Sequence, residues 1–220
     1  MPDIEYFYSA HSAYAYIGAS LLSRIATRAN ARIIHRPIEL RQVVAAMGGA
    51  TNSLTPQRRE YFSGREIERW ASYRGAPIMR GIPTHHDHDL ARANGVLITA
   101  IENGHDINEL SHAMLQAHWR DDADLDDEDD LAKIITAVGF KPARLLGSAL
   151  SPKVQEIHAQ NTAEAIERSV FGSPTYFVDG DMFYGQDHLE LVEQALEKPF
   201  PQLWGQDEEN EITAEAASGD

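Results

Sequence analysis

The chain has 220 residues, of which 43% are hydrophobic and 24% charged, and this composition suits one large globular domain or a domain with an insertion. Its formal net charge of -15, from 34 acidic and 19 basic residues, argues against a nucleic-acid partner and against docking on an anionic membrane, because both require a basic face. The chain has no cysteine, so its own side chains cannot exchange disulfides or build a thiolate zinc site.

The start of the chain predicts a strand, a helix and a second strand. Residues 4–8 are aromatic and are followed by serine, which favours a strand. Residues 13–31 carry apolar side chains at helical spacing, and residues 32–37 form a strand that ends at Pro37. This order implies a parallel pair of strands. No secretory signal is visible here, and no later apolar run reaches the ~20 residues of a membrane span, so we expect a cytoplasmic protein.

The middle of the chain predicts a block of helices with little strand signal. Gly75, Gly104 and Gly139 are typical of helix ends, and Asp89 and Asp126 are typical of helix starts. Apolar residues recur between these signals at the spacing of amphipathic helices. The predicted helices cover residues 67–73, 90–101, 107–119, 129–138 and 154–166.

Strand signals return in the last quarter of the chain. Residues 175–178 and 182–184 are aromatic runs separated by Asp-Gly-Asp, which predicts a β-hairpin. Asp187 is then expected to cap a final helix over residues 188–196. The tail beyond Trp204 is acidic and nearly free of large apolar residues, so we expect it to be disordered.

These elements predict an α/β fold of the thioredoxin type with a large all-helical insertion. Strand, helix and strand come first, the helical block interrupts them, and two strands and a helix complete the sheet. The two ends of the sheet must come together, so the turn before the first helix should meet the segment before the hairpin. We assign residues 1–55 and 169–204 to a discontinuous thioredoxin-like domain, residues 56–168 to the inserted helical domain, and residues 205–220 to the tail.

Three short features in this arrangement could carry chemistry. Ser12 stands where the first strand ends and the first helix begins, and the free N–H groups of a helix start favour an anion. Pro174 stands directly before a strand, where it leaves a gap in the hydrogen-bond ladder. Asp187 marks a second helix start. Each has an ordinary alternative, because serine and aspartate are common helix caps and proline commonly opens an edge strand.

Taken together, three longer segments resemble a known family. SAYAYIG (residues 12–18), IERWASYRGAPI (residues 67–78) and VFGSPTYFVDGDMFYGQDHLELVEQAL (residues 170–196) are similar, in this order, to motifs of the 2-hydroxychromene-2-carboxylate isomerases and kappa-class glutathione transferases. The resemblance covers most of residues 4–197. It implies a DsbA-like thioredoxin fold, a homodimer and glutathione as the bound cofactor.

The resemblance also implies roles for individual residues. Ser12 matches the catalytic serine, which hydrogen-bonds the sulfur of glutathione. Ser173 and Pro174 match the segment that pairs with the cysteinyl backbone of glutathione, and Asp187 matches the site of its γ-glutamyl end. Asn52 resembles an asparagine of a variable loop that contacts the tripeptide.

Several positions depart from the family pattern. His188 replaces an arginine of the cofactor site, and Ala13 replaces the proline that follows the serine. His11 precedes the serine and could tune a thiolate or shuttle a proton, although it could equally be a loop histidine without a role. Tyr14 belongs to a group of tyrosines that we expect to be mostly core, with one member lining a substrate pocket.

We therefore predict a glutathione-dependent isomerase that acts on an aromatic-pathway or chromene-like electrophile. The small-molecule substrate would be attacked by a thiolate that the cofactor supplies and that Ser12 stabilises. One alternative is a conjugating or peroxide-reducing transferase of the kappa type, since it would use the same thiolate site. Another is a non-catalytic thioredoxin-fold binding protein.

Two further motifs are expected to lie on the surface. HHDHD (residues 85–89) is interpreted as a surface loop, with substrate-side residues or a metal site as alternatives. Adjacent ligands in one loop rarely converge on a metal ion, so we predict no metal site. DDADLDDEDD (residues 121–130) lacks the glycine turn and terminal glutamate of a calcium loop and is expected to begin a helix.

Overall fold

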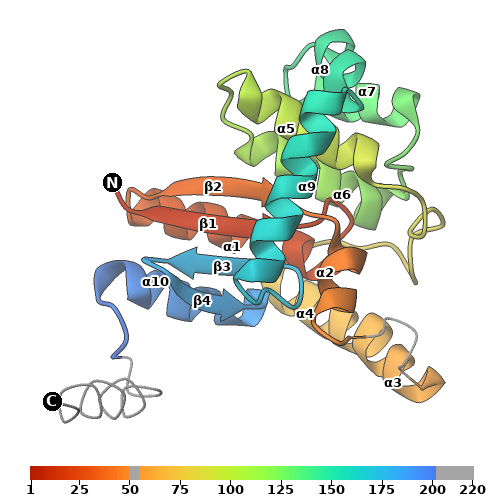
Figure 1. Ribbon diagram of the computed structural model, residues 1–220. Helices are drawn as coiled ribbons and strands as arrows, with labels where there is room; N and C mark the ends of the chain where they lie inside the picture. Colours follow the sequence, from red (N-terminus) through yellow and green to blue (C-terminus); the bar gives the residue numbers. More distant parts are fainter. Residues whose placement is uncertain (50–54, 202–220) are drawn as a thin grey trace, which may run out of the picture.

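Four strands form one mixed sheet in the order β2-β1-β3-β4, and Figure 1 shows them side by side in this order. The computed structural model describes residues 1–49 and 55–201. Strands β1 and β2 are parallel and are joined by helix α1, whereas β3 is antiparallel to both β1 and β4. The four strands are β1 (Asp3–Tyr8), β2 (Arg32–Pro37), β3 (Thr175–Val178) and β4 (Asp181–Tyr184).

The helical insertion separates the two halves of the sheet, as predicted. Helices α2, α3 and α8 were not predicted, because each has eight residues or fewer, which leaves little periodic signal. The helices are α1 (Ala13–Arg28), α2 (Leu40–Ala46), α3 (Pro56–Glu60), α4 (Glu66–Arg74), α5 (Ala91–Glu102), α6 (Asn108–Asp121), α7 (Glu128–Ala137), α8 (Pro142–Ala149), α9 (Pro152–Glu167) and α10 (Leu189–Glu197), with a π-helical turn η1 (Tyr61–Arg65) and a 3-10 turn η2 (Gln186–His188).

Helices cover both faces of the sheet because strand side chains alternate between its faces. Tyr6 and Tyr8 of β1 stack on each other with ring centroids 4.1 Å apart and pack in the large core that contains α1 and α10. Phe7 points to the opposite face and packs with Phe177 and with Val43 of α2 and Ala165 of α9. In Figure 1, α9 crosses this second face. The expected core role of most of the tyrosines is thus confirmed for β1.

The insertion and the sheet share one continuous core, and helices α5, α7 and α8 gather beyond the β2 edge of the sheet (Figure 1). Within the insertion, α5 and α8 touch backbone to backbone: a Cβ added to Gly95 would lie 2.2 Å from the carbonyl oxygen of Ala149. Only glycine fits there. The predicted domain boundaries remain predictions, because packing is continuous across them. No helix in the described parts of the chain has the length and hydropathy of a membrane crossing.

Three predicted helix ends needed correction. Helix α1 stops at Arg28 rather than at residue 31. Asp127, not Asp126, caps α7 and accepts from the backbone N–H groups of its first turn. The prediction that Asp187 caps the last helix was wrong: Asp187 lies inside η2, and α10 begins after His188 without a side-chain cap. Several aspartates adjoin the start of α7, so composition alone could not select the capping position there.

Candidate functional site

Ser12 lies at the junction of β1 and α1, as the sequence predicted, and is only 7% exposed. Its Oγ accepts a hydrogen bond from the backbone N–H of Ala15 at 3.2 Å, so Ser12 is the N-cap residue of α1. The same hydroxyl donates to the carbonyl oxygen of Ser173 at 3.0 Å, across a sequence separation of 161 residues. The predicted meeting of the first turn and the pre-hairpin segment is therefore confirmed.

Ser173 is bound to the first turn by its side chain as well as by its backbone. Its Oγ accepts from the backbone N–H of Ser9 at 3.2 Å. The Ser173–Pro174 peptide bond is cis, and the Pro174 carbonyl accepts from the backbone N–H of Gly185 at 2.9 Å. The serine here therefore ties the two segments together directly.

A cavity of about 890 Å³ opens above these residues. We call its buried base, formed by His11, Ser12 and Ser173, the cavity floor. The cavity wall comes from the insertion, and its apolar and imidazole side chains include Phe62, Ile67, Ile82, His86 and Trp119.

Tyr14 and Trp119 join the floor to the insertion through single hydrogen bonds. The Tyr14 hydroxyl donates to the carbonyl of Phe62 at 2.9 Å, and burial raises the pKa of Tyr14 to about 12. The indole Nε1–H of Trp119 donates to the carbonyl of His11 at 2.7 Å, and the indole is buried. Both aromatic side chains line the cavity. A contact between Tyr14 and a substrate remains a prediction.

Three histidine rings stand next to one another at the side of the floor. His11 and His86 have ring centroids 4.7 Å apart, and His86 and His118 are stacked at 5.3 Å. His11 Nδ1 shares a hydrogen bond with Ser9 Oγ at 3.0 Å, and His86 Nδ1 shares one with His118 Nε2, also at 3.0 Å. The second ring nitrogen of His118, Nδ1, lies 3.0 Å from the carbonyl of Ala123. The rings therefore form one connected group.

The hydrogen bonds of this histidine group fix its tautomers. A carbonyl only accepts, so Nδ1 of His118 must carry its proton. A neutral His118 then accepts at Nε2 from Nδ1–H of His86, which leaves Nε2 of His86 unprotonated. Burial, with a smaller effect of His118, lowers the pKa of His86 to about 4, and burial holds the pKa of His11 well below its ordinary value. These rings are therefore neutral near pH 7. His11 lies in the turn before α1, but it is buried, so the alternative of a partly exposed loop histidine was wrong about its exposure.

The other predicted site residues lie apart from the floor. Asp187 lines a second, smaller hollow of about 480 Å³ with the insertion residues Glu66, Trp70 and Arg74. His188 hydrogen-bonds the carbonyl of Tyr184 and lines a different depression beside β4, so the structure does not bring it to Ser12. Asn52 lies outside the described residues.

The sequence analysis missed two residues that the structure places at the cavity. Trp119 has no motif around it that distinguishes it from a core residue of α6. His86 belongs to the HHDHD stretch that we expected on the surface, yet it turns into the cavity wall. Arg41 of α2 lies near this wall, with its guanidinium 3.1 Å from the carbonyl of Asp87. Contacts made between segments far apart in the chain leave no local sequence signal.

Comparison with known proteins assigns this arrangement to a family. Residues 3–197 match the family model of the DSBA-like thioredoxin domain. The chain is 26% identical over 197 residues to 2-hydroxychromene-2-carboxylate isomerase of Sphingobium xenophagum, covering 88% of this chain and 97% of the relative. It is 25% identical to the enzyme of the same name from Pseudomonas putida, covering 88% and 93%. A solved structure of a 2-hydroxychromene-2-carboxylate isomerase superposes with a TM-score of 0.72 at 22% identity, covering 89% of this chain and 95% of that one. The predicted fold is thereby confirmed.

Proposed function

Because the chain belongs to the DSBA-like thioredoxin domain family, we propose that it is a glutathione-dependent isomerase of the 2-hydroxychromene-2-carboxylate isomerase type, acting on an aromatic-pathway or chromene-like electrophile. The observation that carries this proposal is the Ser12 hydroxyl, held at the start of α1 on the floor of a cavity large enough for two small molecules. The names of the relatives support the reaction type.

The donor set of the floor fits glutathione. When bound, glutathione supplies a thiol, the nucleophile that this cysteine-free chain lacks. Ser12 offers a hydroxyl donor for sulfur, and Ser173 offers backbone groups for a peptide, both within one cavity. Asp187 offers a carboxylate for an amino group in the neighbouring hollow, and α4 contributes residues to both the hollow and the cavity. We assign the cofactor to these residues and to Pro174.

Ser12 can stabilise an anion in two ways. It stands at the N-terminus of a helix of 16 residues, whose unpaired N–H groups favour negative charge by on the order of 1 kcal/mol. Its hydroxyl carries one proton, which it now donates to the Ser173 carbonyl. A ligand N–H donated to that carbonyl would replace Ser12 there and leave the hydroxyl proton available to a sulfur. The floor thus has a donor that ligand binding can redirect.

The neutral histidines supply proton acceptors at the edge of the floor. Nε2 of His86 is unprotonated in the tautomer that its hydrogen bonds require, and it belongs to a residue that lines the cavity. His11 lies next to Ser12 in the chain and is also neutral. The unprotonated Nε2 of His86 can accept a hydrogen bond from a thiol or from a hydroxyl of the substrate, and the lowered pKa keeps this ring neutral as it does so. The side chains of Phe62, Ile82 and Trp119 supply an apolar surface for an aromatic substrate.

A titration and a product analysis test this function. Calorimetry with glutathione should give saturable binding, and aromatic ring-cleavage intermediates should then isomerise with no net loss of glutathione. Consumption of glutathione would instead assign the transferase activity. Glutathione binding without turnover on any substrate would support the non-catalytic alternative, and no binding would contradict the cofactor assignment.

A further inference from the structure

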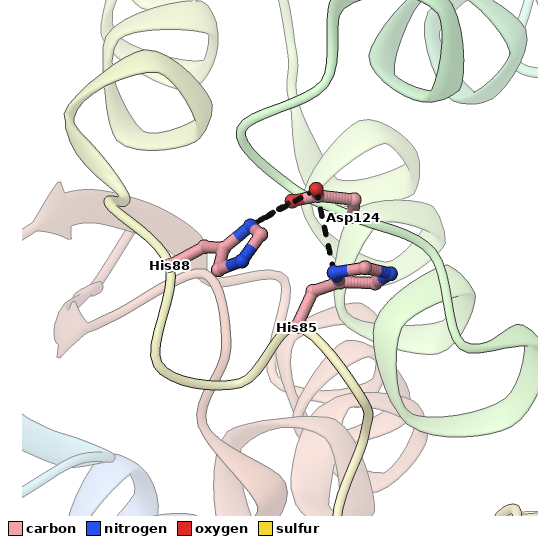
Figure 2. A group of neighbouring side chains, drawn as sticks. All are labelled: His85, His88 and Asp124. Atoms are coloured by element: carbon pink, nitrogen blue, oxygen red, sulfur yellow. Dashed lines mark hydrogen bonds and ion pairs between the residues drawn. The ribbon is translucent and has the colours of Figure 1, made fainter.

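Two motifs that the proposed function does not use lie against each other in the structure. The HHDHD loop (residues 85–89) precedes α5, and the acidic run (residues 121–130) joins α6 to α7. Figure 2 shows His85 and His88 of the first segment and Asp124 of the second, with both rings directed at the carboxylate. The sequence analysis argued against a metal because one loop would have to supply every ligand. The fold removes that objection, since Asp124 lies 36 residues further along the chain than His88.

The three side chains place their ligand atoms close together. Nδ1 of His88 is 3.0 Å from Oδ2 of Asp124, and Nδ1 of His85 is 3.5 Å from the same oxygen. One nitrogen from each ring and one carboxylate oxygen all lie within 4.8 Å of one another. Tetrahedral ligands at metal–ligand distances of about 2.0–2.2 Å are roughly 3.3–3.5 Å apart. The two nitrogen–oxygen distances are therefore close to those of a coordination sphere, and the remaining distances within the group do not exceed 4.8 Å.

Neighbouring contacts hold the two segments in register. Thr84 donates to Asp122 from both its backbone N–H, at 2.6 Å, and its hydroxyl, at 2.7 Å. The carboxylate of Asp124 accepts from the backbone N–H of Asp126 at 3.0 Å, and the backbone N–H of Asp124 donates to Asp130. Hydrogen bonds of this kind orient the ligands of metal sites. The carboxylates of Asp122 and Asp130 also add negative charge that attracts a cation.

We propose that His85, His88 and Asp124 bind a divalent first-row transition metal ion, with Zn²⁺ as its first candidate. Two imidazoles and one carboxylate suit Zn²⁺, Ni²⁺ or Cu²⁺, whereas Ca²⁺ and Mg²⁺ prefer oxygen ligands alone. His88 is 49% exposed and Asp124 18%, so water can reach the site and complete the coordination. This proposal revises the expectation of no metal.

The metal would stabilise the loop that contributes His86 to the cavity wall. His86 lies between the two histidine ligands in sequence, and its ring lines the cavity. An ion that joins residues 85 and 88 to Asp124 would fix the loop that carries His86, in addition to the Thr84–Asp122 contact. The proposed metal site does not depend on the isomerase function, because its ligands lie outside the cavity floor.

The experiment is a Zn²⁺ titration of the full, chelator-treated chain without a histidine tag, followed by calorimetry and by metal analysis after dialysis. We expect one equivalent to be retained, with an increase in melting temperature. His88→Ala and Asp124→Asn should each weaken binding by more than ~100-fold, and Asp122→Asn, which changes only a neighbouring contact, by about 10-fold. Their melting temperatures without metal establish that the variants are folded.

Two matched variants separate this site from general attraction to the acidic surface. His105→Ala removes another exposed histidine, and Asp129→Asn removes another charge of the acidic run. Both should bind Zn²⁺ within about threefold of the unchanged chain. The proposal is overturned if Asp129→Asn and Asp124→Asn weaken binding equally, if His88→Ala binds normally, or if the unchanged chain retains no metal.

Discussion

The floor and the wall of the cavity differ in how they are built. The floor joins the end of β1 to the segment before β3, and Ser12 and Ser173 are only 7% and 8% exposed. Its contacts are hydrogen bonds of 3.0–3.2 Å between side chain and backbone. The wall comes from the insertion, where Ile82 is 45% exposed and His86 is carried on a loop. The floor is thus fixed by the pairing of strands, whereas the wall depends on how the insertion packs.

This difference suggests a division of roles between the floor and the wall. A buried hydroxyl at a helix start can act only on what reaches the floor, so we expect the floor to determine the chemical step. Exposed apolar side chains contribute contact area with little directionality, so we expect the wall to determine which substrate binds. The following variants test this division, from the largest expected effect to the smallest.

Ser12→Ala should lower kcat by about 10²–10³-fold, because it removes the hydroxyl donor that stands at the start of α1. Glutathione binding should change far less, since Ser173 and Asp187 remain. The lost helix cap should also reduce the free energy of unfolding by about 1 kcal/mol. Steady-state kinetics and denaturant unfolding measure the two effects. Ser20→Ala, on the exposed side of the same helix, is the matched control. Full turnover by Ser12→Ala would contradict the assigned role.

Trp119→Phe should reduce the free energy of unfolding by about 1–3 kcal/mol, because the carbonyl of His11 loses its buried donor. Trp70 is only partly buried and is the matched control, so Trp70→Phe should cost less than about 1 kcal/mol. Urea denaturation followed by circular dichroism measures both variants. Equal losses would mean that the bond between α6 and the floor does not matter for stability.

His11→Asn should make the protein less sensitive to acid. Burial lowers the pKa of His11 below the ordinary 6.5, so the unfolded chain binds a proton that the folded chain does not, and stability falls as the pH falls below 6.5. In the variant, the slope of the free energy of unfolding against pH should be smaller by up to about 1.4 kcal/mol per pH unit, which corresponds to one proton. His86, His118 and Arg41 face the ring and remain in place.

The measurement for His11→Asn is denaturant unfolding at several pH values between 4 and 7. His105→Asn, which changes an exposed histidine, should keep the slope of the unchanged chain. If both variants show the same slope as the unchanged chain, His11 takes up its proton in the folded state and the burial argument fails.

Ile82→Ala should raise KM for an aromatic substrate by roughly fivefold and leave kcat nearly unchanged. The lost apolar contact is worth about 1 kcal/mol, and the exposed position of Ile82 makes a large loss of stability unexpected. Leu191→Ala, on α10 and 40% exposed, changes a similar side chain away from the cavity and should leave KM unchanged. A fall in kcat instead of a rise in KM would remove the distinction between floor and wall.

Much of the fold followed from local patterns in the sequence. Apolar spacing predicted the longer helices, the Asp-Gly-Asp turn predicted the β3–β4 hairpin, and the serine after β1 predicted the start of α1. The order of these elements predicted the thioredoxin-type fold, and the resemblance to known motifs added the DsbA-like assignment and the expected roles of Ser12, Ser173 and Asp187. Helices α2, α3 and α8 were missed, because elements of eight residues or fewer have almost no periodicity.

The sequence by itself determined the order of the elements and the position of Ser12 at a helix start, because hydrophobic spacing and capping act within a few residues. Only the tertiary structure decided that the Ser12 hydroxyl meets the Ser173 carbonyl, that His11 joins His86 and His118, and that Asp124 meets His85 and His88. These partners lie up to 161 residues apart. Their contacts result from the burial of apolar faces elsewhere in the chain, so no local pattern around either partner records them.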